Sequence, residues 1–530
     1  MTGISLELVR SMKDSRDGRG AIAGRLSTGL VCLATGLAGC GSQPVHDAGL
    51  GPATPALSAE SRATIERFCG DCHRLPLASS FPRDRWPAEV RQGYDFYLTA
   101  ARSDLRRPVE RDAIRFFQDQ APERLSIPRA SDRSERPTTI RFVPAPLSPV
   151  FTADDPAIAA MYWRPKQRDM LVSDMRRGRV ERWTLTPGSE AVQMVAELRH
   201  PCRIVPLNAT GEGGTYLVSD LGSFLPADHA DGSLWWLEES ATGFTSRLLR
   251  DGLARIVEAH PIEGDATTQV VVAEFGWRST GALRIVSTIP DISADRVLDP
   301  RHGAVSARVA DMDGDGRTDI VAAFGQEHET VDVYWNRGDG EYEHAVVHAF
   351  PDPSWGTSGC ELADIDGDGR IDILHANGDT LDSGLAKPYH GVRWLRNLGD
   401  RFFEVREIGL MPGVCQASAA DLDGDGDLDV VACSLHQAAP LEPAGTYDSL
   451  AWFEQRSDGT FAPHSIERDS CNHTCFALAD IDGDARIDLV AGTWQGQETR
   501  TAAPAAVIYR NLPVLLTAAQ NEDYSSRGAD

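Results

Sequence analysis

Four short loops in the second half of this 530-residue chain carry aspartates at one fixed spacing. The loops recur every 53 to 59 residues, and their aspartates stand at loop positions one, three, five and nine. They are Asp311, Asp313, Asp315, Asp319, Asp364, Asp366, Asp368, Asp372, Asp421, Asp423, Asp425, Asp429, Asp480, Asp482, Asp484 and Asp488. Carboxylates at this spacing converge on one point, where a backbone carbonyl at position seven joins them, and such a set of oxygens suits Ca²⁺. The spacing predicts up to four calcium sites, and the alternative is acidic turns that stay solvated.

These calcium sites are expected to stiffen the fold rather than to catalyse, because a closed cage of oxygen ligands has little reason to bind a substrate. In the fourth loop Ala485 stands where the others have glycine. A glycine at this turn supplies a positive φ that alanine adopts with strain. We therefore expect the fourth site to be the weakest.

A second chemical motif is Cys69-Gly-Asp-Cys72-His73. In an exported protein this spacing predicts one covalently bound haem c, with thioethers from both cysteines and His73 as an iron ligand. A local disulfide and half of a zinc site are the alternatives. Because residues 74–144 contain no Met, His or Lys, the sixth iron position is open, weakly filled by Tyr94 or Tyr97, or completed by a later residue such as Met161 or a histidine.

Short helices must position this motif. A helical pattern after Ser58 buries Ile65 and Phe68 and runs directly into the cysteines. Two more helices are expected, one from Pro87 carrying Val90, Tyr94 and Tyr97, and one after Pro108 carrying Ile114 and Phe117. A helix before the haem motif and another at the end of a short domain resembles class I cytochrome c. The Met ligand usual in that family is missing here.

The aspartate loops must lie between β-strands. The clearest unit predicts four antiparallel strands, at Ala304–Ala310, Asp319–Phe324, Val331–Trp335 and Tyr342–His348. A four-stranded unit that repeats at this period is typical of a propeller blade. The fold class predicted from the sequence is therefore all-β, a propeller preceded by a small helical domain.

Three earlier blades lack the aspartate loop but keep the strand pattern. Their second strands start near Met170, Tyr216 and Val270, which brings the expected number of blades to seven. The last blade is short after Asn511. We expect Ile140–Val143 to supply its outer strand and to close the ring.

Strand order separates the two faces of a propeller. The aspartate loops join first and second strands, so the loops before each first strand and those between second and third strands gather on the opposite face. This second face predicts a ligand, partner or catalytic site, with catalytic candidates His302, Glu327, His328, His390 and His473. Other polar residues expected there are Asp228, His229, Glu274, Asp379 and Lys387. The alternative is a set of loop residues that only make turns and hydrogen bonds.

The remaining cysteines carry less information. Cys471-x-His473-x-Cys475 suggests a metal site but has no clear fourth ligand. The others are buried thiols or disulfides of an oxidising compartment, and they are Cys202, Cys360, Cys415 and Cys433.

The N-terminus predicts export. Basic residues precede an apolar run from Leu26 to Leu37, which is too short to span a membrane in the mature protein. The run ends in Leu37-Ala-Gly-Cys40, which resembles the bacterial lipobox with Cys40 as the lipidated residue; an ordinary secretory signal is the alternative. The expected order is a signal peptide at 1–39, a tether at 40–57, the haem domain at 58–122, a linker at 123–139, the propeller at 140–515 and a disordered tail at 516–530.

The chain carries a formal net charge of −26, which argues against nucleic acid as a partner because a phosphate backbone requires a basic surface. The helical domain is slightly basic and the propeller strongly acidic. Opposite charge favours docking of one on the other.

The aspartate loops resemble those of FG-GAP and VCBS repeats. As a whole the chain resembles bacterial lipoproteins, as in Planctomycetes, that join a haem c segment to such repeats in a seven-bladed β-propeller. The resemblance implies an electron-transfer protein anchored in the cell envelope by lipid, on the outer membrane or cell surface, with a redox protein as partner. The alternatives are an adhesion propeller that binds polysaccharide or protein, and a propeller oxidoreductase that uses the haem as electron acceptor.

Overall fold

The computed structural model describes residues 56–130, 138–208, 214–262, 269–288, 295–381, 383–436, 445–496 and 501–514. The chain divides into two compact units, residues 1–62 and 63–530. The predicted signal peptide, Cys40, most of the tether and the expected tail lie outside the described residues. Within the part of the chain that is described, no helix is long and apolar enough to span a membrane.

The N-terminal part of the described chain is helical. It contains α2 (Ala59–Cys69), the 3₁₀ turn η1 (Ala78–Ser80), α3 (Trp86–Thr99) and α4 (Glu110–Gln118). The predicted helices are confirmed. Phe68 of α2 meets Tyr94 of α3 edge-on, with ring centroids 5.4 Å apart.

The buried face of α4 differs from the prediction by one residue. Ala113, Phe116 and Phe117 are buried, whereas Ile114 is half-buried. Residues at spacings of three and four share a helix face, and this face turns toward Trp86, whose ring stacks on Phe117 at 4.0 Å between centroids. The face that carries Phe117 therefore packs on Trp86, and Ile114 lies at its edge.

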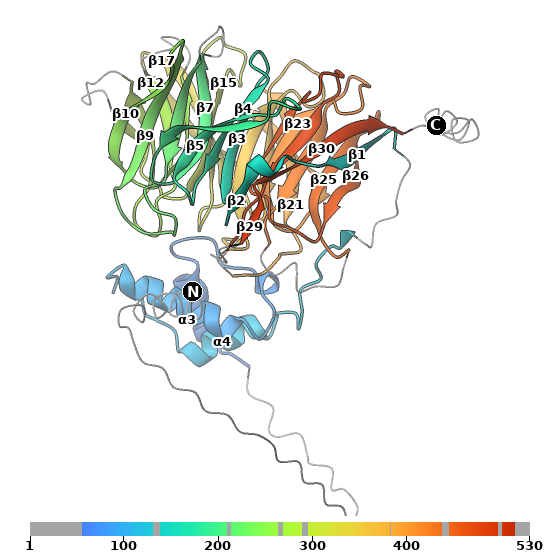
Figure 1. Ribbon diagram of the computed structural model, residues 1–530. Coiled ribbons are helices and arrows are strands. Elements are labelled where there is room, and N and C mark those ends of the chain that lie inside the picture. The colour runs from blue at the N-terminus through green and yellow to red at the C-terminus, as the bar shows by residue number, and fades with distance from the viewer. Residues whose placement is uncertain are drawn as a thin grey trace, which may run out of the picture. The chain divides into compact units, whose positions relative to one another are not determined.

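After the helical part, the described strands form seven four-stranded antiparallel sheets, which are the blades of a propeller (Figure 1). The first three blades comprise β3 (Ile158–Arg164), β4 (Asp169–Asp174), β5 (Arg179–Thr184) and β6 (Ala191–Glu197); β7 (Pro201–Asn208), β8 (Thr215–Asp220), β9 (Gly232–Ser240) and β10 (Gly243–Leu253); and β11 (Ile256–Pro261), β12 (Gln269–Glu274), β13 (Ala282–Ser287) and β14 (Arg296–Asp299). The predicted seven-bladed propeller is confirmed.

The next three blades carry the aspartate loops between their first and second strands. They comprise β15 (Ala304–Ala310), β16 (Asp319–Phe324), β17 (Thr330–Gly338) and β18 (Glu341–Ala349); β19 (Thr357–Ala363), β20 (Asp372–Asn377), β21 (Gly391–Gly399) and β22 (Phe402–Leu410); and β23 (Val414–Ala420), β24 (Asp429–Ser434), β25 (Asp448–Gln455) and β26 (Phe461–Arg468). The unit predicted from residue 304 onward matches β15 to β18.

The seventh blade combines both ends of the propeller sequence. Its strands are β27 (Phe476–Ala479), β28 (Asp488–Gly492), β30 (Ala506–Pro513) and β1 (Ile140–Ala145). β1 pairs antiparallel with β30, from Ile140 opposite Pro513 to Ala145 opposite Ile508, and lies beside it in Figure 1. A two-stranded sheet of β2 (Thr152–Asp154) and β29 (Ala502–Pro504) adds a further link between the two ends. The expected closure of the ring is confirmed.

Burial explains why the second strand of each blade is the easiest to find in the sequence. Every residue of β4, β16, β20 and β24 is buried. These strands have neighbouring blades on both faces, so buried positions follow one another instead of alternating with exposed ones. The outer strand β18 has covered and exposed positions, because one of its faces meets water.

Candidate functional site

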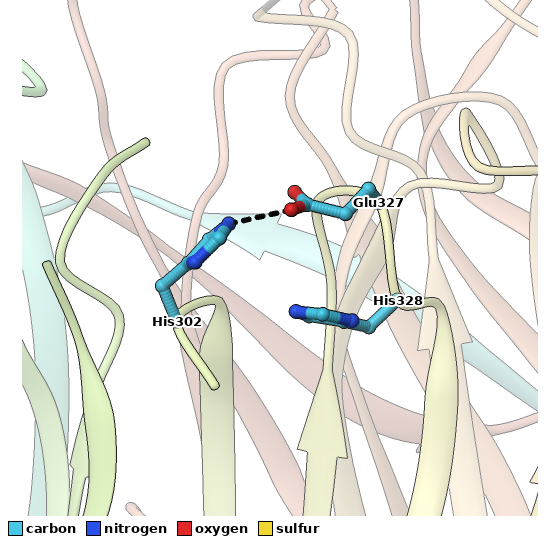
Figure 2. Close-up of side chains that lie close together, drawn as sticks. All are labelled: His302, Glu327 and His328. Carbon is cyan, nitrogen blue, oxygen red and sulfur yellow. Dashed lines mark ion pairs between the residues drawn. The ribbon is translucent and has the colours of Figure 1, made fainter. Parts of the chain in front are cut away.

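Two histidines and a glutamate meet in the fourth blade, in loops of the face opposite the aspartate loops. His302 precedes β15, and Glu327 and His328 lie in the loop between β16 and β17. His302 Nε2 is 2.8 Å from Glu327 Oε1, and the two imidazole rings have centroids 5.3 Å apart. Figure 2 shows the carboxylate and both rings turned toward one another. One ligand atom from each residue lies within 4.8 Å of the other two.

The surroundings of this cluster favour a neutral imidazole at His328 and an ionised carboxylate at Glu327. Burial, helped by the positive charge of Arg301, lowers the pKa of His328. Burial alone would raise the pKa of Glu327, but the hydrogen bond from His302 and the two imidazoles outweigh it and lower that pKa. His328 Nε2 is buried and has no hydrogen-bond partner among the described residues.

The loop that carries Glu327 and His328 has a strained backbone and is hydrogen-bonded to the next blade. Gln326 and Glu329 have left-handed backbones, with φ of 56° and 49°, which cost non-glycine residues on the order of 1–3 kcal/mol each. The buried carboxylate of Glu329 accepts hydrogen bonds from the N–H and Oγ1 of Thr357 at 2.9 and 2.6 Å. This role of Glu329 was not predicted from the sequence. Glutamine and glutamate are not residue types that indicate a left-handed backbone.

The other two predicted histidines lie apart from this cluster. His390 is 1% exposed, and its Nδ1 accepts a hydrogen bond from the backbone N–H of Lys387. Burial holds the pKa of His390 well below its ordinary value. Both ring nitrogens of His473 are engaged, Nδ1 with the carbonyl of Gly492 at 2.8 Å and Nε2 with Glu467 at 2.7 Å. His473 thus links strands of the sixth and seventh blades, whereas Nε2 of His390 is buried without a hydrogen-bond partner among the described residues.

Residues Asp228 and Glu274 line an open depression of about 460 Å³ on the same face. Asp228 Oδ1 accepts hydrogen bonds from the N–H groups of Ser279 and Thr280, at 2.9 and 3.0 Å. Glu274 pairs with Arg284 at 2.5 Å. These carboxylates already have partners within the chain and serve to hold the loops.

The eight cysteines of the described chain are free thiols. Cys471 Sγ points to the carbonyl of Asp448 at 3.6 Å, and Cys475 Sγ to that of Ile158 at 3.5 Å. The two thiols therefore contact different strands. Because the ring of His473 is fully used as well, this arrangement gives no support to a metal at the 471–475 segment.

The ninth-position aspartates fasten the acidic loops to the blades. Asp319 Oδ2 accepts the N–H of Met312 at 3.0 Å, and its Oδ1 accepts that of Asn336 at 2.7 Å. Asp372, Asp429 and Asp488 make the same two contacts in their own blades. All four residues are buried. Each loop is thus tied both to its own backbone and to the third strand.

Loop positions one, three and five present the carboxylates that could hold a cation. Ligand atoms of Asp311, Asp313 and Asp315 lie within 4.8 Å of one another, and so do those of the corresponding residues 421, 423 and 425. In the second loop, positions one, three and nine form such a group. Arginines also reach these loops, as where Arg401 pairs with Asp313 at 2.6 Å.

The third loop differs from the others in its charge balance. It carries Asp427 at the position where the other loops have arginine. Burial, with repulsion from Asp425, raises the pKa of Asp427 to about 7, and burial with repulsion from Asp423 raises that of Asp429 to about 8. Among the described residues no arginine or lysine forms an ion pair with this loop. Its negative charge is therefore the least balanced of the four.

The cysteine motif lies at the C-terminal end of α2. Cys69 is the last residue of the helix, and Cys72 is exposed in the turn that follows. His73 Nδ1 lies 2.7 Å from the carbonyl oxygen of Arg74, a contact in which Nδ1 must donate. The proton on Nδ1 leaves the lone pair on Nε2. Two free thiols one turn apart and such an imidazole are the donor set that haem c requires, so the residues fit that group.

The two tyrosines considered as sixth iron ligands are already in use. Tyr94 OH donates to the carbonyl of Pro108 at 3.1 Å. Tyr97 OH accepts the N–H of Leu105 at 2.8 Å. Met161, the other named candidate, is packed against the core between the first and seventh blades.

The segment after the cysteine motif is hydrogen-bonded to propeller loops of the histidine-bearing face. The carboxylate of Asp352 accepts bonds from the N–H of Leu77 and the Oγ of Ser80, both at 2.7 Å. Lys387 Nζ donates to the carbonyl of Ser80 at 2.8 Å and lies 3.3 Å from the ring centroid of Phe81. Asp352 and Lys387 are both buried. Sequence reasoning placed Lys387 on this face but missed Asp352.

Comparison with known proteins supports the repeat. Residues 311–375, which contain two aspartate loops, match the family described as FG-GAP-like repeat. A crystal structure of an ancestral GH74 enzyme aligns with a TM-score of 0.46 and 10% sequence identity over 69% of this chain. The alignment covers 49% of that enzyme, so the chain spans about half of its length. No curated protein matches the chain. The protein is a seven-bladed β-propeller, and its residues 311–375 match an FG-GAP-like repeat.

Proposed function

We propose that this chain is an electron-transfer protein that carries one haem c, with the propeller as a calcium-stabilised docking scaffold and Cys40 as its lipid anchor in the cell envelope. The observation that carries the proposal is the donor set at Cys69, Cys72 and His73. When bound, the haem supplies a site for one reversible electron. Cys69 and Cys72 would hold it through thioethers and His73 through Nε2, and the contact of His73 Nδ1 with the carbonyl of Arg74 would orient that ring.

The scaffold part of the proposal is supported by the contacts after the motif. A short segment containing Leu77 and Ser80 is bound to buried polar groups of the propeller, Asp352 and Lys387. A polar group buried with a partner is costly to separate from it, because removal leaves the other group unsatisfied. The turn next to the cysteine motif is therefore attached to the propeller, which provides the large surface for a redox partner.

The test is to express the full chain together with a thioether-forming maturation system. After denaturing electrophoresis, haem stain should remain on the protein and should disappear in Cys69→Ala/Cys72→Ala. His73→Ala should keep covalent haem but change the absorption spectrum of the reduced protein. A colourless wild-type protein would refute the proposal.

The sixth iron position can be tested on the same material. The described helices offer no free tyrosine hydroxyl at residues 94 and 97, and residues 74–144 have no Met, His or Lys. We therefore expect carbon monoxide to bind the reduced protein rapidly. Resistance to carbon monoxide would place a ligand from another part of the chain on the iron.

A further inference from the structure

We propose that His302, Glu327 and His328 bind one first-row transition-metal ion, separate from the haem and calcium sites. The three residues offer two imidazole nitrogens and one carboxylate oxygen, which is a set that suits zinc, iron(II) or copper and not calcium. Three protein ligands leave coordination positions free for water or a small ligand, as in catalytic metal sites.

The distances suit a metal bound between these side chains. Ligands that are each about 2.0–2.2 Å from a metal ion lie about 3.0–3.5 Å from one another. His302 Nε2 and Glu327 Oε1 are already 2.8 Å apart. With all three ligand atoms within 4.8 Å of one another, small side-chain rotations bring them to one centre.

The unused nitrogen of His328 distinguishes this cluster from an ordinary ion pair. His464 also pairs with a glutamate, Glu454, at 2.9 Å, and its ring stacks on Trp452. In the proposed site, His328 Nε2 is buried and has no partner among the described residues. A buried nitrogen without a partner is destabilising unless something binds it, and a metal ion would do so.

The charges around the cluster permit a cation. Arg301 is the adjacent basic residue, but it forms ion pairs with both Asp299 and Asp332, so its charge is balanced within the protein. Glu327 contributes one negative charge to the site. The strained residues Gln326 and Glu329 on either side fix the loop before any metal binds, which lowers the entropy cost of assembling the ligands.

The experiment is a calorimetric titration of Zn²⁺ into the tag-free full chain at saturating Ca²⁺, so that the aspartate loops are filled. We expect one tight site, weakened at least ~100-fold in His302→Gln, Glu327→Gln and His328→Gln. His464→Gln is the matched control and should bind as wild type. The Cys69→Ala/Cys72→Ala chain should keep the site, which separates it from the cysteine motif and from the haem proposal.

Ligand identity is tested with one equivalent of Cu²⁺ by electron paramagnetic resonance. Wild type should show coupling to two imidazole nitrogens, and either histidine variant to one. Circular dichroism confirms folding of the variants. His302 and Glu327 are partly exposed, so glutamine at either position should be tolerated if His328→Gln unfolds. Zinc affinity that is unchanged in His302→Gln and Glu327→Gln, nitrogen coupling that is unchanged in His302→Gln, or an equal loss in the control would overturn the proposal.

Discussion

At the scale of single residues, the chain keeps several side chains in conformations or environments that cost free energy. Ala485 is one of them, with φ of 69° in the fourth aspartate loop. The strain predicted there from the missing glycine is thus present. The other examples, Gln326 and Glu329, flank the proposed transition-metal site. Strain at a functional loop persists only when the surrounding structure enforces it.

Ala485→Gly should stabilise the protein by about 0.5–1 kcal/mol. A left-handed backbone costs a non-glycine residue about 1–2 kcal/mol, and the greater freedom of glycine in the unfolded chain offsets part of the gain. Ala191→Gly is the control, because Ala191 is an exposed strand residue without a positive φ. The control should lose stability in urea unfolding. Equal losses in both variants would contradict the explanation.

At the scale of secondary-structure elements, each aspartate loop combines one buried, hydrogen-bonded aspartate with an exposed cluster of carboxylates. The ninth aspartate ties the loop to the third strand, while positions one, three and five collect carboxylates. The third loop lacks the arginine that the others use to balance this charge. Its stability should therefore depend most strongly on a cation.

The effect of Asp425→Asn on the melting temperature should have opposite signs with and without calcium. In chelator it should raise the melting temperature by about 1–3 °C, because one repelling charge is removed. In Ca²⁺ it should lower the melting temperature, because one ligand is lost. Differential scanning calorimetry with and without chelator measures both effects.

Asp368→Asn is the control for the third-loop variant, because Asp368 pairs with Arg370 and Arg396. This substitution should lower the melting temperature under both conditions, since it removes an ion pair as well as a ligand. If Asp425→Asn behaves in the same way as Asp368→Asn, charge repulsion does not dominate the third loop.

At the scale of the whole molecule, the ring is closed by a strand from the start of the propeller sequence. A chain that begins at residue 147 lacks β1, whereas one that begins at residue 138 retains it. The shorter chain leaves β30 as an open edge and exposes the pocket of Ile140, which is 4% exposed in the closed ring. Its melting temperature should fall by at least about 5 °C. Equal melting of the two chains would show that closure contributes little stability.

Lys387, which contacts the segment after the cysteine motif, should make the free energy of unfolding of the whole molecule depend on pH. Burial lowers its pKa to about 8, against the attraction of Asp352 and Glu89 and with the repulsion of Arg85. The unfolded chain keeps a value near 10.4, so between pH 8 and 10 it binds more protons than the folded chain, and stability rises with pH. Lys387→Met should remove this rise, up to about 3 kcal/mol. Urea unfolding of both proteins from pH 7 to 10 measures it, and parallel curves would contradict it.

The sequence by itself was enough to predict the propeller. The recurring aspartate loops, the short strand patterns between them and the short last blade are local patterns, and such patterns can be recognised without knowledge of distant contacts. The same holds for helix α2, whose apolar spacing runs directly into the cysteine motif.

Only the tertiary structure decided which polar residues meet. His302 and Glu327 are 25 positions apart in the sequence and come within hydrogen-bond distance because β15 and β16 are adjacent. In contrast, His390 bonds within its own loop, and His473 bonds to Gly492 of β28 and Glu467 of β26. Asp352 was not predicted on the histidine-bearing face, and the sequence did not indicate the left-handed backbone of Glu329 or its bonds to Thr357. Their environments depend on loops from different blades, and no local pattern encodes which side chains of those loops meet.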